Sequence, residues 1–288
     1  MVPDTAPGRG ACLDGISSLQ WSPVIRMAGQ NFSQHLAGAS WDKTVRVWDV
    51  QQNAQSRQIN MQIQAKGQQQ FQAPVLCCAW DEVGQRIFCG DASNNASVWD
   101  LGSNAVTVVA RHQAPIHSIQ YLNGLGGKQV IATAGWDNKL AFWDTRAPSA
   151  TPIFSATLPG KPLCMDSLYK AGQGMIVVCC ASAAAPAAAS AFGAPPSAGA
   201  DASGSVLLFD LRNPSAPPHT RRSPLCQYPT EGPAPRCVAI DPDCTGYCIG
   251  SVGGRVAVCS KAQAPIPATG QVSFCYVPLH FTRILLTV

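Results

Sequence analysis

The sequence predicts an all-β fold built from repeated four-stranded sheets, and three observations support this prediction. A segment ending in Trp-Asp recurs at residues 38–49, 90–100 and 135–144. Two less well preserved copies follow at 201–210 and 250–259. Successive copies end roughly 45–65 residues apart, near the period of about 40–45 residues that marks WD40 repeats. Each such repeat forms one blade of a β-propeller, so we expect a WD40 β-propeller with about five recognisable blades.

Two intervals between copies are lengthened by segments of unusual composition. Residues 51–72 are rich in Gln, and residues 181–200 consist almost entirely of Ala, Pro, Ser and Gly. We interpret the first segment as a long connection. The second follows an apolar run at 175–180, so we expect a strand there and then a disordered low-complexity loop insertion.

Within each repeat, the pattern predicts two strands, a tight turn, a third strand and a more variable outer strand. The turns are predicted where Asp, Asn and Gly cluster, because these residues tolerate positive φ or bond to their own backbone. These clusters lie at residues 42–43, 94–95, 137–138 and 253–254. Strands with alternating or continuous apolar residues follow the turns at 45–49, 140–143 and 206–209. Apolar strands precede them at 16–21, 74–80, 115–119 and 236–240.

The repeated aromatic side chains are expected in the core, between neighbouring blades. Trp48, Trp99 and Trp143 close the three best copies, and large aromatic residues contribute much of a buried core. His112 precedes the turn residue Asp137 in the third repeat, where we expect it to bond, through other side chains of the blade, towards this carboxylate. Asp42 is the matching turn residue of the first repeat. These roles are structural, and the five histidines show no motif spacing typical of general-base catalysis.

Bulk composition argues against several other functional classes. Only 12% of the residues are charged and the formal net charge is +4, too little to indicate nucleic acid as the main partner. The N-terminal residues lack an apolar stretch, so we expect no secretory signal. Residues 171–200 carry no charge, but three prolines and the Ala, Ser and Gly content argue against a membrane span.

Two further sequence patterns, one of cysteines and one of glycines, would indicate a metal site and a phosphate-binding loop, but both are incomplete. The thirteen cysteines are odd in number and scattered through apolar strands, so we expect reduced, buried thiols. Cys244 and Cys248 have a separation typical of metal ligands, but no second pair follows at zinc spacing, and no metal or cofactor is expected. Residues 124–128 resemble a phosphate-binding loop. They lack its full spacing and its Ser or Thr after Lys128, so we expect a hairpin loop.

Several motifs together are similar to those of the nuclear mRNA export WD-repeat factors. The resemblance covers about residues 14–276. Its motifs lie at 14–23, 74–80, 135–146, 222–225, Tyr228, 236–238 and 250–258. It implies a seven-bladed propeller without enzymatic activity or cofactor, located in the nucleus, at the nuclear envelope and nuclear pore, and also in the cytoplasm. A scaffold of this kind docks on a phenylalanine-glycine nucleoporin by protein–protein interaction and serves RNA export.

Other binding functions remain open. Residues 14–18 and 210–213 would also suit a close paralogue, the spindle-checkpoint WD-repeat protein, a scaffold that binds checkpoint kinases. The segment 51–72, Trp80, residues 142–146 and residues 223–225 favour the export factor. A substrate receptor that recruits ubiquitin machinery is a third alternative, because many propellers have this role. Weak or indirect binding to mRNA–protein particles stays open, although aromatic and basic residues do not alternate as in a stacking platform.

The resemblance also implies a binding site for an acidic peptide on one face of the propeller. Two arginines clamp adjacent glutamates of that peptide, and the motifs place these arginines at Arg236 and Arg255. A guanidinium makes bidentate, charge-assisted contacts to a carboxylate. Lys139 occupies the position of Arg255 in an earlier repeat and would extend the basic path. The alternative is that these residues are ordinary solvated charges at strand ends, and residues 229–235 depart from the family pattern just before Arg236.

We expect the chain to divide into a flexible N-terminus at 1–13, a propeller at 14–276 that contains the insertion 181–200, and a divergent tail at 277–288. Five copies are visible where the resemblance implies seven blades. A C-terminally truncated or mis-spliced product is therefore expected, with apolar blade edges prone to association. The alternative is that the tail pairs as a spare strand and closes the ring.

Overall fold

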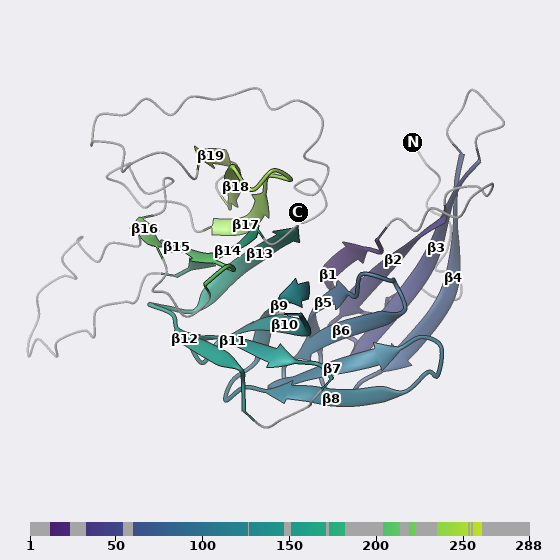
Figure 1. Ribbon diagram of the computed structural model, residues 1–288. Helices are drawn as coiled ribbons and strands as arrows, with labels where there is room; N and C mark the ends of the chain where they lie inside the picture. The colour runs from purple at the N-terminus through teal and green to yellow at the C-terminus, as the bar shows by residue number, and fades with distance from the viewer. Residues whose placement is uncertain are drawn as a thin grey trace, which may run out of the picture. The chain divides into compact units, whose positions relative to one another are not determined.

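The described part of the chain consists of β-strands in five antiparallel sheets (Figure 1). The computed structural model describes residues 12–23, 33–53, 60–125, 127–146, 151–170, 173–181, 204–213, 219–222, 235–252, 254 and 256–260. The chain divides into two compact units. One contains Met1–Asp137 and Ala141–Ile153, and the other contains Asn138–Leu140 and Phe154–Val288.

Four of the sheets have the four-stranded order of a propeller blade, in which consecutive strands pair as neighbours. The first sheet contains β1 (Ile16–Trp21), β2 (Ser33–Ser40), β3 (Thr44–Asn53) and β4 (Asn60–Gln70). The second contains β5 (Val75–Trp80), β6 (Arg86–Asp91), β7 (Asn95–Asp100) and β8 (Val106–Arg111). The third contains β9 (Ile116–Leu125), β10 (Lys128–Gly135), β11 (Lys139–Asp144) and β12 (Phe154–Thr157).

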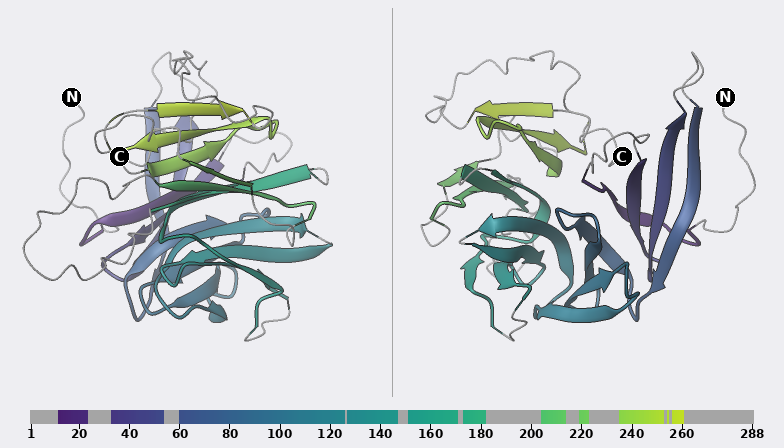
Figure 2. Two further views of the ribbon diagram at one scale, coloured as in Figure 1. Left: turned by 90° about the vertical axis from the view of Figure 1, so that its left-hand side faces the viewer. Right: turned by 45° about the vertical axis from the view of Figure 1, so that its right-hand side comes forward.

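The remaining two sheets lie in the second unit. The fourth sheet contains β13 (Pro162–Lys170), β14 (Gln173–Cys180), β15 (Ser205–Asp210) and β16 (His219–Arg222). The fifth contains β17 (Pro235–Ile240), β18 (Gly246–Ser251) and β19 (Val256–Ser260), shown in yellow-green in Figure 2. These sheets confirm the predicted all-β fold and its five blades.

The strands predicted from the repeat pattern are confirmed, with one correction. The Gln-rich residues 51–72 are not a long connection, because β3 extends to Asn53 and Asn60–Gln70 forms the fourth strand of the first blade. Gln side chains fit this strand because β4 lies at the edge of its sheet, and its side chains from Ile63 to Lys66 are exposed. Edge strands with polar side chains resist pairing with other chains.

The core lies between successive blades. In the first unit, apolar side chains of β2 and β3 pack with those of β5, β6 and Trp99. A second cluster joins β5 and β6 with Ile116, Ile131 and Trp143. In the second unit, side chains of β13, β14 and β15 pack with Ile240, Tyr247 and Ile249. Trp99 and Trp143 are 2% and 4% exposed, which confirms their predicted core position.

The predicted tight turns are also confirmed. The turns that join the second and third strands of three blades contain Lys43, Asn94 and Asn138 at φ 67°, 71° and 59°. Gly254 adopts φ 71° in the matching turn of the fifth blade. The hairpin loop predicted at 124–128 is confirmed by its described residues: Gly124 and Gly127 have positive φ, and the Gly127 N–H donates to the Gly124 carbonyl at 3.1 Å.

Several predictions fall wholly or partly outside the described residues. These are the N-terminus at 1–13 apart from its last two residues, the insertion 181–200 apart from Ala181, and the tail 277–288. Ala181 and Gly204 show where the insertion departs, because it occupies the turn between β14 and β15. All eleven cysteines of the described residues are free thiols, and no cluster of metal-ligating side chains occurs among them. The described residues contain no helix long and apolar enough to cross a membrane.

Candidate peptide-binding face

Each blade has an end at which its inner strand begins and its second and third strands are joined. We call this the turn end. It is defined in the first three blades by residues 15–17 with 41–43, 74–76 with 92–94, and 115–117 with 136–138. One backbone hydrogen bond repeats there: the N–H groups of Trp41, Ala92 and Trp136 donate to Gly15, Pro74 and Pro115 at 2.9–3.0 Å. Ala181 donates to Lys161 in the same way in the fourth blade, at 2.8 Å.

A β-bulge begins the inner strand of every blade at this end. In the fifth blade Pro235 pairs with Ser251 and Cys237 pairs with Gly250, which leaves Arg236 as the extra residue. The pairing of the other four blades leaves one extra residue at the same position, namely Ser17, Leu76, His117 and Leu163. A bulge re-aims a side chain out of the regular alternation of a strand. Arg236 is exposed, so the bulge presents its guanidinium to solvent at the turn end.

Neighbouring blades within a unit have their turn ends on the same side. In the first unit, Ser17 Oγ donates to the Val75 carbonyl at 2.5 Å, and Cys77 Sγ lies 3.6 Å from the Ile116 carbonyl. In the second unit, the Ile240 N–H donates to the Asp166 carboxylate at 2.9 Å, which holds β17 beside β13. Each unit therefore has a face made of adjacent turn ends.

The structure describes two of the three predicted peptide-binding residues, Arg236 and Lys139. Arg236 is the bulge residue of β17, and Lys139 is the exposed first residue of β11 in a different sheet. Arg255 lies outside the described residues, but Gly254 and Val256 on either side of it lie at the turn end of the blade that carries Arg236. Lys139 and Arg236 therefore lie on different blades, whereas the Arg236 and Arg255 positions belong to one blade.

Carboxylates at the turn ends point inward, whereas cations point outward. The side chains of Asp42 and Asp137 are each 7% exposed and bond within their own blades. Asp91 is 6% exposed and accepts the N–H groups of Ser93 and Asn95. Exposed cations at these ends are Lys43, Lys139, Lys161 and Arg236. Asp14 is an exposed acid near Lys43 in the first unit. Lys139, Lys161 and Arg236 belong to the second unit, where they give the described turn ends a basic character suited to carboxylate ligands.

In the third blade, a buried chain of hydrogen bonds fixes the turn. His112 Nδ1 lies 3.0 Å from both carboxylate oxygens of Asp137, and His112 Nε2 lies 2.7 Å from Thr133 Oγ1. Trp143 Nε1 donates to the same hydroxyl at 2.8 Å. The predicted link between His112 and Asp137 is therefore direct, and not relayed through other side chains. Thr133 and Trp143 extend the chain on the other side of the imidazole.

The first blade replaces this chain with an ion pair. By backbone position, Cys12 corresponds to His112 and Gly38 to Thr133, so the imidazole and hydroxyl are missing. Arg46 is the partner of the turn carboxylate instead: its Nη1 donates to Asp42 Oδ2 at 2.7 Å and to Thr44 Oγ1 at 2.6 Å. Burial opposes ionisation of Asp42, but hydrogen bonds from Thr44, the Leu13 amide and Arg46 hold its pKa well below the usual range. Asp42 thus keeps its predicted role with a different partner.

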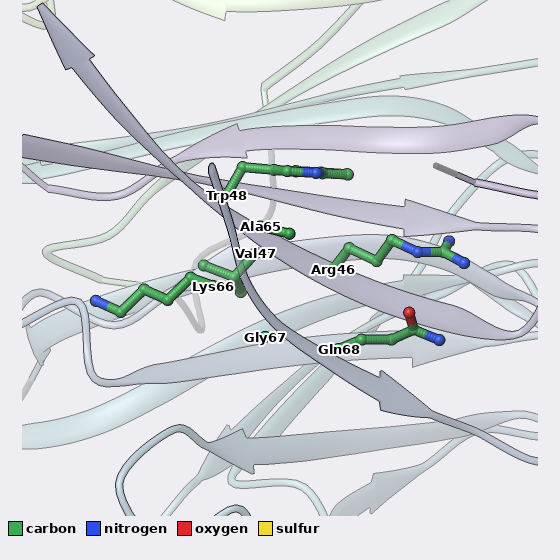
Figure 3. A pocket seen from close by; sticks show the side chains of 7 residues that line it. All are labelled: Arg46, Val47, Trp48, Ala65, Lys66, Gly67 and Gln68. Carbon is green, nitrogen blue, oxygen red and sulfur yellow. The ribbon is translucent and has the colours of Figure 1, made fainter. Parts of the chain in front are cut away.

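Trp48 departs from the predicted core position. It is half-buried, and together with Arg46, Val47 and four residues of β4 it lines a hollow of about 240 Å³ (Figure 3). Arg46 and Gln68 extend to one side of this hollow and Lys66 to the other. Lys66 Nζ lies 2.6 Å from His35 Nε2. Burial, and then the Lys66 charge, lower the pKa of His35 although Asp49 opposes this. The cations of the hollow thus already have partners, and it is separate from the turn ends.

Two features of these sites were not predicted from the sequence. The amino-acid composition gives no sign of the bulge at Arg236. The number of residues from each inner strand to its turn is similar in the blades, and aligning the repeats on this spacing would have matched Arg236 with His117. Arg46 was missed because it occupies an alternating strand position where a polar residue usually faces solvent.

Comparison with known proteins agrees with this architecture. The WD domain, G-beta repeat family model matches residues 10–49 and 65–100. A crystal structure of the WD40 β-propeller domain of Doa1 aligns with a TM-score of 0.51 at 12% identity, over 86% of this chain and 65% of that one. This likeness concerns the fold alone. The chain is a WD40-repeat β-propeller protein.

Curated relatives confirm the more specific resemblance to mRNA export WD-repeat factors. An mRNA export factor of Danio rerio is 32% identical over 265 residues, which are 91% of this chain and 59% of that protein. Protein Rae1 of Drosophila melanogaster is 28% identical over 249 residues, 85% of this chain and 59% of that protein. The mRNA export factor rae-1 of Caenorhabditis elegans is 29% identical over 255 residues, 86% of this chain and 57% of that protein. The chain thus spans less than two thirds of the length of these relatives.

Proposed function

We propose that this protein is a non-enzymatic adaptor in nuclear mRNA export, which acts in the nucleus and at the nuclear pore by binding an acidic nucleoporin peptide. The names of its relatives support the export role. The observation that carries the peptide site is Arg236, an exposed guanidinium at a β-bulge of the fifth blade.

Arg236 and Arg255 are proposed to clamp adjacent glutamates of the partner. Pro235 pairs with Ser251, so the start of β17 lies beside the end of β18, from which the chain continues to Arg255. Two guanidinium groups at one turn end can each bind a carboxylate through two parallel hydrogen bonds. Because the Asp side chains of the described turns are turned inward, they would not repel an incoming acidic peptide.

Lys139 is proposed to extend the basic path on another blade. It follows Asn138, whose positive φ ends the turn and starts β11 with an exposed side chain. A flexible ammonium acts as a point charge without a fixed fork. We therefore assign Lys139 a role in attracting the acidic peptide and the arginines the role of fixing its register.

A competition pull-down tests the export assignment. The purified chain is passed over beads that carry either an acidic nucleoporin peptide or an acidic peptide from a checkpoint kinase. We expect retention by the nucleoporin peptide and elution by the same peptide in solution. Preferential retention by the kinase peptide would instead support a checkpoint scaffold. Retention by neither peptide, with export unchanged in cells that carry Arg255→Glu, would refute the adaptor assignment.

A further inference from the structure

An amine and an imidazole of the first blade are in direct contact. Lys66 Nζ lies 2.6 Å from His35 Nε2, and Asp49 Oδ1 lies 3.7 Å from the same nitrogen. Strand pairing builds this contact: His35 of β2 pairs with Asp49 of β3, and a bulge opposite Val47 and Trp48 leaves Lys66 as the extra residue of β4. A bulge re-aims a side chain out of the regular alternation of a strand. The three side chains thus come together from three adjacent strands.

The imidazole is held in place by its own strand and by the next blade. The His35 N–H donates to Ser22 Oγ at 3.0 Å, and the Ser22 N–H donates to the His35 carbonyl at 2.8 Å. The centroid of the His35 ring lies 6.4 Å from that of Trp80. Because burial and the Lys66 charge lower the pKa of His35 against the effect of Asp49, the ring is mostly neutral at neutral pH. A neutral imidazole nitrogen at hydrogen-bond distance can accept a proton from an amine.

The amine is accessible to reagents from solvent. Lys66 is exposed, and β4 lies at the edge of its sheet. It is also the only charged residue of β4, so no acid on its own strand stabilises the ammonium form. Lys128 provides a contrast, because its Nζ lies 3.7 Å from the Asp144 carboxylate. An opposite charge at this distance favours the ammonium form, which is not nucleophilic.

We propose that Lys66 is an acylation site of this protein, with His35 as the general base, and that it takes activated acyl donors of the thioester class. The free amine of Lys66 attacks the carbonyl carbon, and a carbon–nitrogen bond forms. The nitrogen of the adduct gives its proton to His35 Nε2, and the nearby Asp49 carboxylate stabilises the imidazolium. The carbon–sulfur bond then breaks, the thiolate leaves, and the proton passes from His35 to the thiolate or to solvent. The product is a neutral amide on Lys66.

Competitive acetylation of the folded chain tests this proposal. The chain is incubated with a limiting amount of acetyl coenzyme A at neutral pH, digested, and analysed by mass spectrometry for each lysine. Lys128 is the matched control, because its side chain is 49% exposed and contacts a carboxylate instead of an imidazole. We expect Lys66 to be acetylated at least about tenfold faster than Lys128, a modest share of what general-base catalysis can supply. The two rates should converge in concentrated urea, where the contact is lost.

Two histidine variants then assign the effect to His35. His35→Gln keeps a polar side chain but removes the base, and should slow acetylation of Lys66 at least about fivefold while leaving Lys128 unchanged. His117→Gln replaces a half-buried histidine of the third blade and should change neither rate. If His35→Gln does not fold, the comparison of folded and urea-denatured wild-type chains still decides the matter. Equal acetylation of Lys66 and Lys128 in the folded chain would overturn the proposal, as would a Lys66 rate that His35→Gln leaves unchanged.

Discussion

The His112 imidazole shows how a single buried side chain can hold a turn in place. It bridges the Asp137 carboxylate and the Thr133 hydroxyl, and its side chain is only 1% exposed. Asp137 in turn accepts the Gln113 N–H, so the network ties the chain entering the blade to the turn between β10 and β11. Lys139 directly follows this turn, as the first residue of β11.

Removing the imidazole should therefore destabilise the protein. We expect His112→Ala to lower the free energy of unfolding by about 2–4 kcal/mol, because Asp137 and Thr133 would lose buried partners. Urea unfolding followed by tryptophan fluorescence measures this change. The control His117→Ala alters a half-buried histidine at the bulge and should cost about 1 kcal/mol or less. Equal losses for the two variants would contradict the role assigned to His112.

The ionisation of Asp42 makes the stability of the first blade depend on pH. Its pKa in the folded chain is held below the value of about 3.9 for an unfolded aspartate. The stabilisation is therefore fully present above about pH 5 and is lost as the pH falls through 4 towards the folded pKa. We expect Asp42→Asn to be clearly less stable than wild type at pH 7, with the gap narrowing at pH 3. A gap that stays constant across urea titrations at pH 7, 5 and 3 would exclude this linkage.

The strands and turns of the blades could be predicted from the sequence wherever a single local pattern was sufficient. Turn residues such as Asn94 and Asn138 combine positive φ with an apolar strand on the far side, so strand and turn could be predicted together. The edge strand β4 could not, because its Gln-rich sequence lacks alternation and becomes a strand only through pairing with β3. The bulge at Arg236 likewise depends on pairing with β18, and no local pattern encodes it.

Close packing of inner strands makes some glycines irreplaceable. A Cβ on Gly90 would lie 2.7 Å from both Cys77 Sγ and Ile116 Cγ2, whereas one on Gly67 would lie 3.5 Å from Trp99, an ordinary contact. We expect Gly90→Ala to destabilise the chain by about 1–3 kcal/mol through overpacking. Gly67→Ala should change stability by less than about 1 kcal/mol. Thermal unfolding of both variants compares them, and equal effects would argue against the packing described for β5, β6 and β9.

At the scale of the whole molecule, stability rests on packing between blades rather than on covalent cross-links. All described cysteines are free, and several lie in the centre of the interblade clusters, such as Cys78 and Cys179. Fold class and blade number followed from the sequence because the repeat is long-range and regular. The division into two compact units did not, because it depends on contacts between elements and not on composition.

Reducing agent should therefore leave the fold unchanged. We expect the midpoint of thermal unfolding with excess dithiothreitol to stay within about 1 °C of that of freshly purified chain, because the eleven cysteines in the described part of the chain form no disulfide that would constrain the unfolded state. Differential scanning fluorimetry with and without the reductant measures the shift. A fall of several degrees would show that a cross-link contributes to the fold.

Binding of an acidic peptide to Arg236 tests the central claim most directly. Fluorescence anisotropy would measure the affinity of a labelled nucleoporin peptide with two adjacent glutamates for wild type, Arg236→Glu and Arg212→Glu. Arg212 is the charge-matched control, since it is exposed, lies at the opposite end of its blade and pairs with Asp210. We expect Arg236→Glu to weaken binding by at least about 30-fold, or 2 kcal/mol, and Arg212→Glu to change it less than about threefold. Equal weakening by both variants, or none by Arg236→Glu, would contradict a peptide site at the turn end of the fifth blade.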